Sequence, residues 1–257
     1  MKLNYVRFKE LDSTNNFAKQ YASEGGALPA LIISSRQSDG RGRMGRRFES
    51  NEETGLYMTV VLKAPKNNAF LRMTALSAVC AVESIKRLFG LQTYIKWVND
   101  IYYNSKKVGG ILAESFFVDD ERYVAVGFGI NLYTEFTGEL EDIATSLFYG
   151  YPDSYTLNAQ KDVLADNIAE RLLEALEADD LTPYMEKYRA RSCVVGKRVS
   201  FVENGATYTG TATDITDEGA LVVETLDGSL KHLTSGEISV RVERSELVCV
   251  EIFLLPF

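Results

Sequence analysis

Histidine, cysteine and long apolar runs are all scarce in this 257-residue sequence. With a single histidine, His232, the sequence excludes a multi-histidine metal site and disfavours Ser-His-Asp or Cys-His catalysis. The cysteines, Cys80, Cys193 and Cys249, are odd in number and lack metal-type spacing, which is typical of a protein in a reducing cytoplasm. Residues 1–12 are charged and alternating, so no secretory leader is expected. No apolar run approaches the roughly 20 residues that span a membrane.

Positive charge is also in short supply. Lysine and arginine number 28 against 36 acidic residues, so the net charge is −8 and the pI is near 4.9. Proteins that bind nucleic acid over a wide surface usually carry a basic face, and this chain as a whole does not. The exception is local, because Arg41, Arg43, Arg46 and Arg47 are close neighbours in the chain. Such a concentrated cluster favours a small anionic ligand over a long polyanion.

The chain is long enough for one large domain with a small appendage. Strand-like runs cover residues 5–11, 30–35, 55–63, 93–103, 108–118 and 122–132. Apolar residues at helical spacing predict helices over 15–24 and 71–89, across 163–176, and from Thr182, with Thr182 as cap and Pro183 in the first turn. Polar turns at 104–106 and 119–121 predict hairpins. Together these elements predict an α+β fold in which helices flank a mixed β-sheet.

From about Cys193 the pattern changes to short strands separated by turn residues. The turns are Asn204-Gly205, Asp217-Glu218-Gly219, Asp227-Gly228 and Ser235-Gly236, and they divide five short strands. This spacing predicts a small β-barrel, and we place the domain boundary between residues 191 and 192. The last residues, 248–257, are apolar. An extra edge strand, an interface segment and a poorly ordered end all fit that tail.

The strongest chemical signal is Gly40-Arg41-Gly42-Arg43-Met44-Gly45-Arg46-Arg47, which we name the arginine loop. Glycine lets the backbone approach a ligand closely, and arginine supplies forked, permanently charged donors that match carboxylates and phosphates. No Gly-Lys-Ser/Thr follows the glycines, and their spacing does not fit a dinucleotide fingerprint. The pattern predicts a mobile clamp for an anion. From these residues alone, a solvated basic loop and an RGG-like nucleic-acid segment remain alternatives.

A second signal is the segment Lys96-Trp97-Val98-Asn99-Asp100, where polar residues interrupt strand formers. The Asp100 carboxylate is a candidate Mg²⁺ ligand, and the Asn99 amide is a candidate partner for phosphate or ribose oxygens. For Lys96 and Trp97, ordinary sheet packing with a snorkelling amine is the alternative.

Two further segments carry glycine beside polar groups. Lys107 precedes Gly109-Gly110, where it can place a positive charge at the meeting point of two anions. In Gly127-Phe128-Gly129-Ile130-Asn131, the strand glycines predict the close approach of a ligand or another backbone, to which Asn131 would offer its amide. A bulge or a turn explains those glycines equally well.

Taken together and in order, these segments resemble the motif series of biotin–protein ligases. The matching blocks are Asp12-Ser13-Thr14-Asn15, Gln37 with the arginine loop, Lys96-Trp97-x-Asn99-Asp100, Lys107-x-x-Gly110-Ile111-Leu112-x-Glu114 and Gly127-x-Gly129-Ile130-Asn131. The resemblance extends to about residue 242. It implies a class II synthetase-like catalytic domain, residues 1–191, followed by an SH3-like β-barrel with the apolar tail, residues 192–257.

The chain departs from the family's pattern at three places. Val98 stands where proline is usual and Phe48 where tryptophan is usual, and the sequence leaves their effect on kinetics open. The motifs begin by residue 12, so the resemblance is to the short form without an N-terminal helix-turn-helix domain. Repressor activity is therefore not expected.

The resemblance implies an ATP-dependent ligase. It would form biotinyl-5′-AMP from biotin and ATP and then transfer biotin to a lysine of a biotin carboxyl carrier protein or domain of a biotin-dependent carboxylase. ATP and Mg²⁺ are the implied cofactors. Neither nucleic acid nor membrane is expected as a partner, and monomer and homodimer both stay open, as does the identity of the carrier.

The resemblance also assigns roles to single residues. The implied biotin-binding residues are Ser13, Thr14, Asn15, Gln37, Gly40, Arg41, Lys107 and Gly110. The implied ATP-binding residues are Arg43, Arg46, Lys96, Trp97, Asn99, Asp100 and Asn131, with Asp100 also the implied metal ligand. Lys107, Arg41 and Arg43 are the implied catalytic residues, and Arg43 would guard the intermediate. For Ser13 and Thr14, helix capping is the alternative and is compatible with ligand binding.

Three competing functions fit the sequence less well. Lipoate ligases share the activate-then-transfer logic, but they carry an Arg-Arg-x-Ser-Gly-Gly-Gly-type loop and a histidine that this chain lacks. A nucleic-acid module is disfavoured by the acidic balance, and the barrel segment has no basic run with interleaved aromatics. A catalytically inactive biotin sensor is disfavoured because Lys107, Asp100 and the arginine loop are all present.

Overall fold

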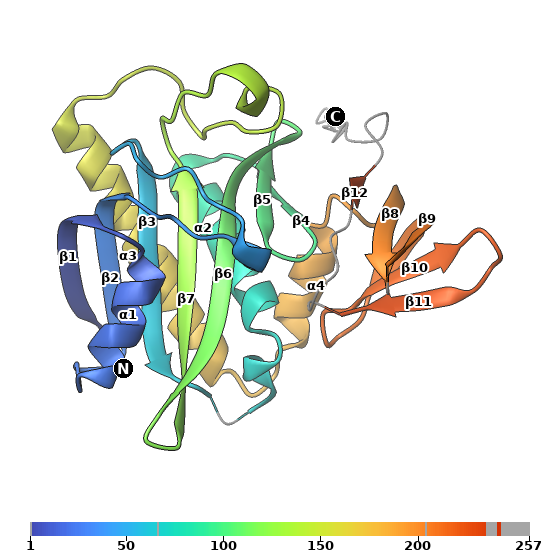
Figure 1. Cartoon of the computed structure of the whole chain (residues 1–257), viewed down its shortest axis with the longest axis horizontal. Coiled ribbons are helices and arrows are strands. Elements are labelled where there is room, and N and C mark those ends of the chain that lie inside the picture. Colours follow the sequence, from blue (N-terminus) through green and yellow to red (C-terminus); the bar gives the residue numbers. More distant parts are fainter. Residues whose placement is uncertain (1, 66, 204, 235–240, 243–257) are drawn as a thin grey trace, which may run out of the picture.

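The computed structural model describes residues 2–65, 67–203, 205–234 and 241–242, and its larger part is built on a seven-stranded sheet (Figure 1). The strands are β1 (Asn4–Leu11), β2 (Ala30–Gln37), β3 (Gly55–Lys63), β4 (Tyr94–Lys96), β5 (Asp100–Tyr103), β6 (Lys106–Val118) and β7 (Glu121–Asn131). Their order across the sheet is β1-β2-β3-β7-β6-β5-β4. Strands β1 and β2 run parallel and the other neighbours antiparallel, so the expected mixed sheet is confirmed.

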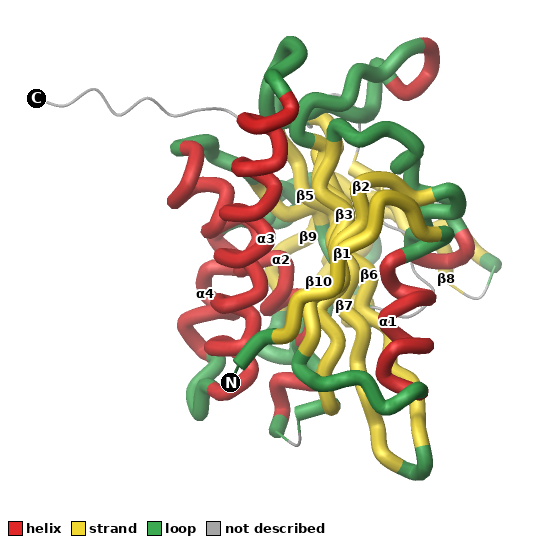
Figure 2. The backbone as a smooth tube through the Cα atoms, turned by 90° about the vertical axis from the view of Figure 1, so that its left-hand side faces the viewer, coloured by secondary structure: helices red, strands yellow, loops and turns green. Residues whose placement is uncertain are grey.

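Helices cover both faces of this sheet (Figure 2). Helix α1 (Thr14–Ser23) lies on one face, and α2 (Met73–Phe89), α3 (Ser154–Glu177) and α4 (Thr182–Ala190) lie on the other. Short 3₁₀ turns occur at η1 (Arg43–Gly45), η2 (Asn68–Phe70) and η3 (Gly138–Leu140). None of the helices within the described residues is long and apolar enough to cross a membrane.

Helix α2 shows how the apolar spacing becomes a core. Ala78, Val82 and Ile85 recur every three or four residues and are buried. They belong to the same core cluster as Ile168 and Leu172 of α3. The helix ends at Gly90, whose φ of 72° lies in the left-handed region that glycine adopts without strain. The predicted end of this helix is therefore confirmed.

The polar turns between the later strands are tight hairpins, as expected. The β5–β6 turn places Asn104 and Ser105 at φ of 48° and 62°, and the β6–β7 turn places Asp119 and Asp120 at 45° and 63°. Asparagine and aspartate tolerate this backbone region better than most residues. Strands β6 and β7 pair along their whole common length. The segments that carry two of the sequence motifs thus lie side by side in the sheet.

The expected single strand over 93–103 is wrong. The chain turns at residues 97–99, and Lys96 of β4 pairs with Asp100 of β5 across an antiparallel hairpin. The physical reason is that Asn99 in the turn bonds a neighbouring strand: its Nδ2 donates to the carbonyl of Ile111 at 2.8 Å. The polar residues of this segment therefore form a turn at the sheet's edge.

Two helix starts also differ from expectation. Thr182 is the first residue of α4 and not its cap, because its N–H donates to Oδ1 of Asp180 at 2.9 Å. Pro183 does lie in the first turn. Helix α2 begins at Met73, and the preceding Leu71 is 72% exposed, so it does not belong to the buried face.

A second, antiparallel sheet follows α4. Its strands are β8 (Arg198–Glu203), β9 (Ala206–Ile215), β10 (Leu221–Thr225), β11 (Leu230–Leu233) and β12 (Arg241–Val242), in the order β11-β10-β9-β8-β12. A small all-β module after the α+β part is therefore confirmed. The predicted turn at Ser235-Gly236 and the apolar tail, residues 248–257, lie outside the described residues.

Hydrogen bonds join β4 and the β4–β5 turn to the segments before and between the strands of the second sheet. The indole N–H of Trp97 donates to the carbonyl of Gly219 at 2.9 Å. Ile95 of β4 bonds the main chain of Arg191 and Cys193, at 2.7 and 3.0 Å. The domain boundary between residues 191 and 192 stays a prediction.

Candidate active site

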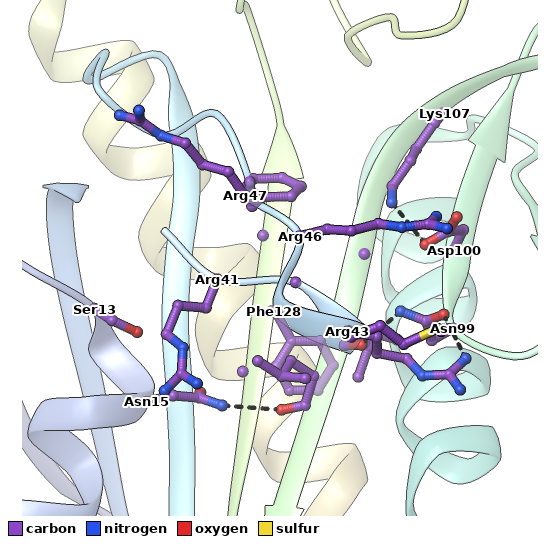
Figure 3. A pocket seen from close by; sticks show the side chains of 18 of the residues that line it. Ser13, Asn15, Arg41, Arg43, Arg46, Arg47, Asn99, Asp100, Lys107 and Phe128 are labelled. Atoms are coloured by element: carbon purple, nitrogen blue, oxygen red, sulfur yellow. Dashed lines mark hydrogen bonds and ion pairs between the residues drawn. The ribbon is translucent and has the colours of Figure 1, made fainter. Parts of the chain in front are cut away.

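The sequence motifs meet at one pocket of about 190 Å³ (Figure 3). Its walls come from the start of α1, the arginine loop, the β4–β5 turn and strands β6 and β7. Every site residue predicted from the sequence lines it except Gly40 and Asn131; the lining ones are Ser13, Thr14, Asn15, Gln37, Arg41, Arg43, Arg46, Lys96, Trp97, Asn99, Asp100, Lys107 and Gly110. The fold thus assembles residues from distant parts of the chain into one cavity.

One end of the pocket is uncharged and is organised by Gln37. Its Oε1 accepts the backbone N–H of Thr14 at 2.8 Å and lies 3.1 Å from the Thr14 hydroxyl, while its Nε2 donates to Oγ of Ser50 at 3.1 Å. Gln37 therefore satisfies an N–H that the start of α1 leaves without a helical partner. Ser13 is the N-cap residue, but its side chain makes no capping hydrogen bond. The capping interpretation of Ser13 is wrong, and its side chain lines the pocket instead.

A buried network holds Asn15 beside this end. Its Nδ2 donates to Oε2 of Glu114 at 2.8 Å and to the carbonyl of Leu112 at 3.2 Å. Its Oδ1 lies 2.7 Å from the hydroxyl of Thr59. That hydroxyl also lies 2.9 Å from the hydroxyl of Thr14. The polar residues at the start of α1 are therefore tied to β3 and β6.

Two further features support this network. Burial raises the pKa of Glu114, but hydrogen bonds from Lys19 and Asn15 outweigh it, so the pKa lies below its ordinary value and the group stays a carboxylate. A Cβ at Gly127 would lie 2.3 Å from Oδ1 of Asn15. The strand glycine therefore makes room for a site side chain of this chain.

The arginine loop is a compact hairpin over the pocket. Arg41 and Arg47 form an antiparallel bridge, and the N–H of Gly42 donates to the carbonyl of Arg46 at 2.7 Å. Met44 and Gly45 reverse the chain with φ of 58° and 71°. In Figure 3, Arg46 extends toward Asp100, whereas Arg47 points away from it. The hairpin thereby distributes its cations over more than one wall.

Arg43 reaches from this loop to the β4–β5 turn. Its Nη1 donates to Oδ1 of Asn99 at 3.4 Å. Burial lowers the pKa of Arg43, and the nearby Asp100 carboxylate counteracts that shift. An arginine remains a cation at neutral pH in either case. Arg41 is held differently, by a 2.8 Å hydrogen bond from its Nη1 to Oδ1 of Asn16.

The opposite end of the pocket carries an ion pair. Nζ of Lys107 lies 2.7 Å from Oδ1 of Asp100, and the two side chains are 34% and 26% exposed. The main chain of Lys107 is fixed by bonds with Ile143 and Thr145, at 2.9 and 2.8 Å. Nζ of Lys96 donates to the hydroxyl of Tyr102 at 3.2 Å. This end is therefore built to hold positive charge beside a single carboxylate.

Trp97 serves both the pocket and the packing. It lines the cavity but is only 5% exposed, and its indole N–H donates to the carbonyl of Gly219. The hydroxyl of Tyr188 donates to the carbonyl of Val98 at 2.8 Å. The packing interpretation of Trp97 thus holds together with its place in the lining.

Gly40 and Asn131 lie outside the lining. A Cβ at Gly40 would meet Oγ of Ser50 at 2.2 Å and the carbonyl of Phe48 at 2.4 Å. Glycine at this position therefore lets the residues that follow the arginine loop pack directly against the loop's first residue. Asn131 is buried at the end of β7, where its Nδ2 donates to the carbonyl of Thr145 at 3.1 Å. Their assigned ligand contacts stay predictions.

Several lining residues had no predicted role in the site. These are Gly42, Met44, Arg47, Phe48, Ile111, Leu112, Gly127, Phe128 and Gly129. The clearest omission is Phe48, because a Cβ at Gly129 would lie 2.6 Å from Cε1 of its ring. The glycine in the strand did signal a close approach, and the approaching group is the Phe48 side chain.

Comparisons with known proteins identify the class of protein to which this fold belongs. Residues 8–131 match the biotin/lipoate A/B protein ligase family, and residues 194–241 match the biotin protein ligase C terminal domain. The first match contains every residue that lines the pocket, and the second contains most of the C-terminal sheet. The fold is thus that of the ligase class that includes the biotin and lipoate enzymes.

Individual relatives identify the family within this class of ligases. The chain is 32% identical over 243 residues to the bifunctional ligase/repressor BirA of Bacillus subtilis, covering 90% of this chain and 72% of that protein. It is 28% identical to the biotin--[acetyl-CoA-carboxylase] ligase of Mycobacterium tuberculosis, covering 88% and 85%. The biotin protein ligase of Aquifex aeolicus, solved with biotin and ATP, matches with a TM-score of 0.77 and 27% identity, covering 93% and 99%. This chain belongs to the biotin protein ligase family.

Proposed function

We propose that this chain joins biotin to a carrier protein in two steps, through biotinyl-5′-AMP. The observation that carries the proposal is a pocket with two chemically different ends. Thr14 and Gln37 offer uncharged hydrogen-bonding groups at one end, and Lys107 and the arginine loop offer cations at the other. Biotin has the same polarity, with an uncharged ureido ring and a carboxylate. The related Aquifex aeolicus structure holds biotin and ATP, which supports the assignment.

Each end of the pocket has its own task in this proposal. Ser13, Thr14 and Gln37 bind the ureido ring, with Asn15 behind them. Arg41 and Gly110 line the biotin side, and Gly40, which lies next to the lining, is assigned to the same ligand. Arg43, Arg46, Lys96, Trp97, Asn99, Asp100 and Asn131 are the residues that we assign to ATP.

In the first step, a carboxylate oxygen of biotin attacks the α-phosphorus of ATP. A new P–O bond forms, the bond from the α-phosphorus to the bridging oxygen breaks, and pyrophosphate leaves with that electron pair. Both reactants are anions, so Lys107, Arg41 and Arg43 act by reducing their repulsion. Holding the two groups in line removes on the order of 7–11 kcal/mol of the barrier.

The donor set of the pocket fits a magnesium ion that arrives with ATP. Magnesium sites in such enzymes use one or two carboxylates together with substrate phosphates. Asp100 supplies a carboxylate on the pocket wall, and the residues described hold no cluster of three or more His, Cys, Asp or Glu side chains. We propose Asp100 as the protein ligand. When bound, the ion would neutralise phosphate charge.

In the second step, a neutral lysine amine of the carrier attacks the acyl carbon of the adenylate. The amide bond forms, the bond from the acyl carbon to the phosphate oxygen breaks, AMP leaves, and the amine gives up a proton. Water would destroy this mixed anhydride. The arginine loop lies over the pocket, where it would exclude water until the carrier arrives.

The carrier is a biotin carboxyl carrier protein or the equivalent domain of a biotin-dependent carboxylase, and no nucleic acid is required. The catalytic part is residues 1–191, and residues 192–257 form the accessory module. Monomer and homodimer are both compatible with the site, and a reducing cytoplasm fits the buried thiol of Cys80.

The test combines two assays on the purified chain. Exchange of labelled pyrophosphate into ATP should depend on biotin, and mass spectrometry should find one biotin on a carrier domain incubated with biotin and MgATP. Lipoate in place of biotin is the control, and it should support neither reaction. An absence of both products with biotin would refute the proposed function.

A further inference from the structure

The β4–β5 turn carries Asn99 and leads directly into Asp100, two residues that we assign to ATP. The ladder between the two strands stops at the pair of Lys96 and Asp100, so the polar groups of the turn find their partners outside the hairpin. Nδ2 of Asn99, for example, donates to the carbonyl of Ile111 in β6 at 2.8 Å. The position of the turn therefore depends on bonds to other elements of the fold.

Tyr188 of α4 supplies one of these bonds. Its hydroxyl donates to the carbonyl of Val98 at 2.8 Å, and Tyr188 and Val98 are only 1% and 5% exposed. A main-chain carbonyl that loses its donor in such a place is costly, because the site is shielded from water. The Tyr188 hydroxyl thus fixes the residue that directly precedes Asn99 in the chain.

The surroundings of Tyr188 also include the arginine loop. Burial raises the pKa of Tyr188, so the phenol keeps its proton and stays a donor at neutral pH. The positive charge of Arg43 opposes this rise, so Arg43 lies within electrostatic range of the phenol. Nη1 of Arg43 donates in turn to Oδ1 of Asn99 at 3.4 Å, a contact drawn in Figure 3. Tyr188 is therefore near the point where the arginine loop contacts the turn.

The uncharged end of the pocket has separate supports. Gln37 accepts the N–H of Thr14 at 2.8 Å and donates to Ser50 at 3.1 Å. These three residues belong to α1, to β2 and to the segment between η1 and β3. A displacement of the β4–β5 turn therefore changes the nucleotide end first, and the two ends should respond differently to a loss of the Tyr188 hydroxyl.

We propose that Tyr188 is a positioning residue for the nucleotide, because its hydroxyl holds the Val98 carbonyl and thereby keeps Asn99 and Asp100 where ATP meets them. Tyr188 does not line the pocket, so it acts through the turn and touches no reactant. The inference rests on the proposed function, in which the β4–β5 turn forms part of the ATP site.

Tyr188→Phe removes the hydroxyl and keeps the ring. We expect kcat/KM for ATP in biotin-dependent pyrophosphate exchange to fall roughly ten- to hundredfold, since a lost hydrogen bond and a displacement of about 1 Å have effects of this size. The dissociation constant for biotin, measured by calorimetric titration without nucleotide, should stay at the parent value. A general loss of structure would change both quantities, so a change in the first alone is specific to positioning.

Tyr133→Phe is the matched control. The Tyr133 side chain is also buried, its hydroxyl donates to Oε1 of Gln160 at 2.9 Å, and it does not line the pocket. This variant should retain the parent kcat/KM for ATP. Asn99→Ala tests the route of the effect, because a hydroxyl that acts through the turn should matter less once the Asn99 side chain is gone.

Glu83→Ala tests the same support if Tyr188→Phe does not fold. Oε1 of Glu83 in α2 lies 3.0 Å from Nη2 of Arg191, and the carbonyl of Arg191 accepts the N–H of Ile95 in β4 at 2.7 Å. Alanine preserves helix α2, and the lost carboxylate loosens the end of α4 that carries Tyr188. We expect a severalfold fall in kcat/KM for ATP and an unchanged affinity for biotin.

The outcomes separate the two proposals. A parent protein without biotin-dependent exchange refutes the proposed function. With an active parent, the positioning role alone is refuted if Tyr188→Phe matches Tyr133→Phe, weakens biotin binding equally, or costs as much in the Asn99→Ala background. A loss confined to ATP and reduced in that background supports the role. Where Tyr188→Phe does not fold, parent-level kinetics of Glu83→Ala refute the role, and a loss confined to ATP supports it.

Discussion

Removal of the Lys107 ammonium is the most direct perturbation of the charged end of the pocket. Lys107→Met keeps the length of the side chain and leaves the Asp100 carboxylate, 2.7 Å from the lost nitrogen, without its partner. Two unit charges about 4 Å apart interact by roughly 4 kcal/mol near a protein surface. Loss of one group that stabilises developing charge costs about 10²–10³ in kcat. We therefore expect biotin-dependent pyrophosphate exchange to fall by about 10²–10³.

The double variant Lys107→Met/Asp100→Asn tests the electrostatic origin of this loss. The second substitution removes a charge that the first has left unpaired, so the losses should be less than multiplicative. Lys63→Met is the matched control, because Lys63 is an exposed lysine of β3 whose nearest acid is Glu121 at 3.6 Å. It should retain the parent rate.

Two results would contradict this reasoning. The first is a Lys107→Met variant that exchanges pyrophosphate within threefold of the parent. The second is a double variant whose loss equals the product of the single losses, since the two groups would then act independently. Circular dichroism and thermal melting of each variant establish that a lost rate reflects the site and not the fold.

Three further perturbations test other parts of the site. Arg43→Gly should release biotinyl-AMP, so that added serum albumin acquires biotin on a streptavidin blot; labelling at the parent level would refute the guard role. Glu114→Gln should lower the melting temperature at neutral pH, because a carboxyl with a depressed pKa stabilises the fold only while it is ionised. The difference in melting temperature between parent and variant should therefore shrink as the pH falls below 4.5. A difference that stays constant down to roughly pH 3 would refute the stabilising role of the Glu114 carboxylate. Gly129→Ala should displace Phe48 and weaken biotin binding severalfold in calorimetry, because its Cβ would lie 2.6 Å from the ring; unchanged affinity would contradict this.

Apolar periodicity and turn residues were sufficient to predict most of the helices and strands. The strand over 55–63 and the helix end at Gly90 were predictable because each follows from a local signal, β-branched residues in one case and a left-handed glycine in the other. The turn at 97–99 was not. Trp97 and Asn99 turn there because they bond Gly219 and Ile111, which lie elsewhere in the chain.

The same distinction applies to the site. Cations such as Lys107 and Arg43 were predictable because their residue type and glycine context already indicate anion binding. Thr59 and Glu114 were not assigned a role, since a threonine in a strand is ordinary until its neighbours are known. Gly127 signalled a close approach, but only the structure identifies the approaching group as Asn15.

The two ends of the pocket are built on different physical terms. At the uncharged end, Thr59 is fully buried and its hydroxyl lies within hydrogen-bond distance of both Asn15 and Thr14, so the fold itself holds these polar groups in place. At the charged end, Lys107 remains partly exposed, and its field is weakened by water until the pocket is covered. Asp100 holds the ammonium in place meanwhile, so that incoming anions meet a cation already positioned. Substitutions at the first end should therefore change which ligand binds, and substitutions at the second should change how fast it reacts.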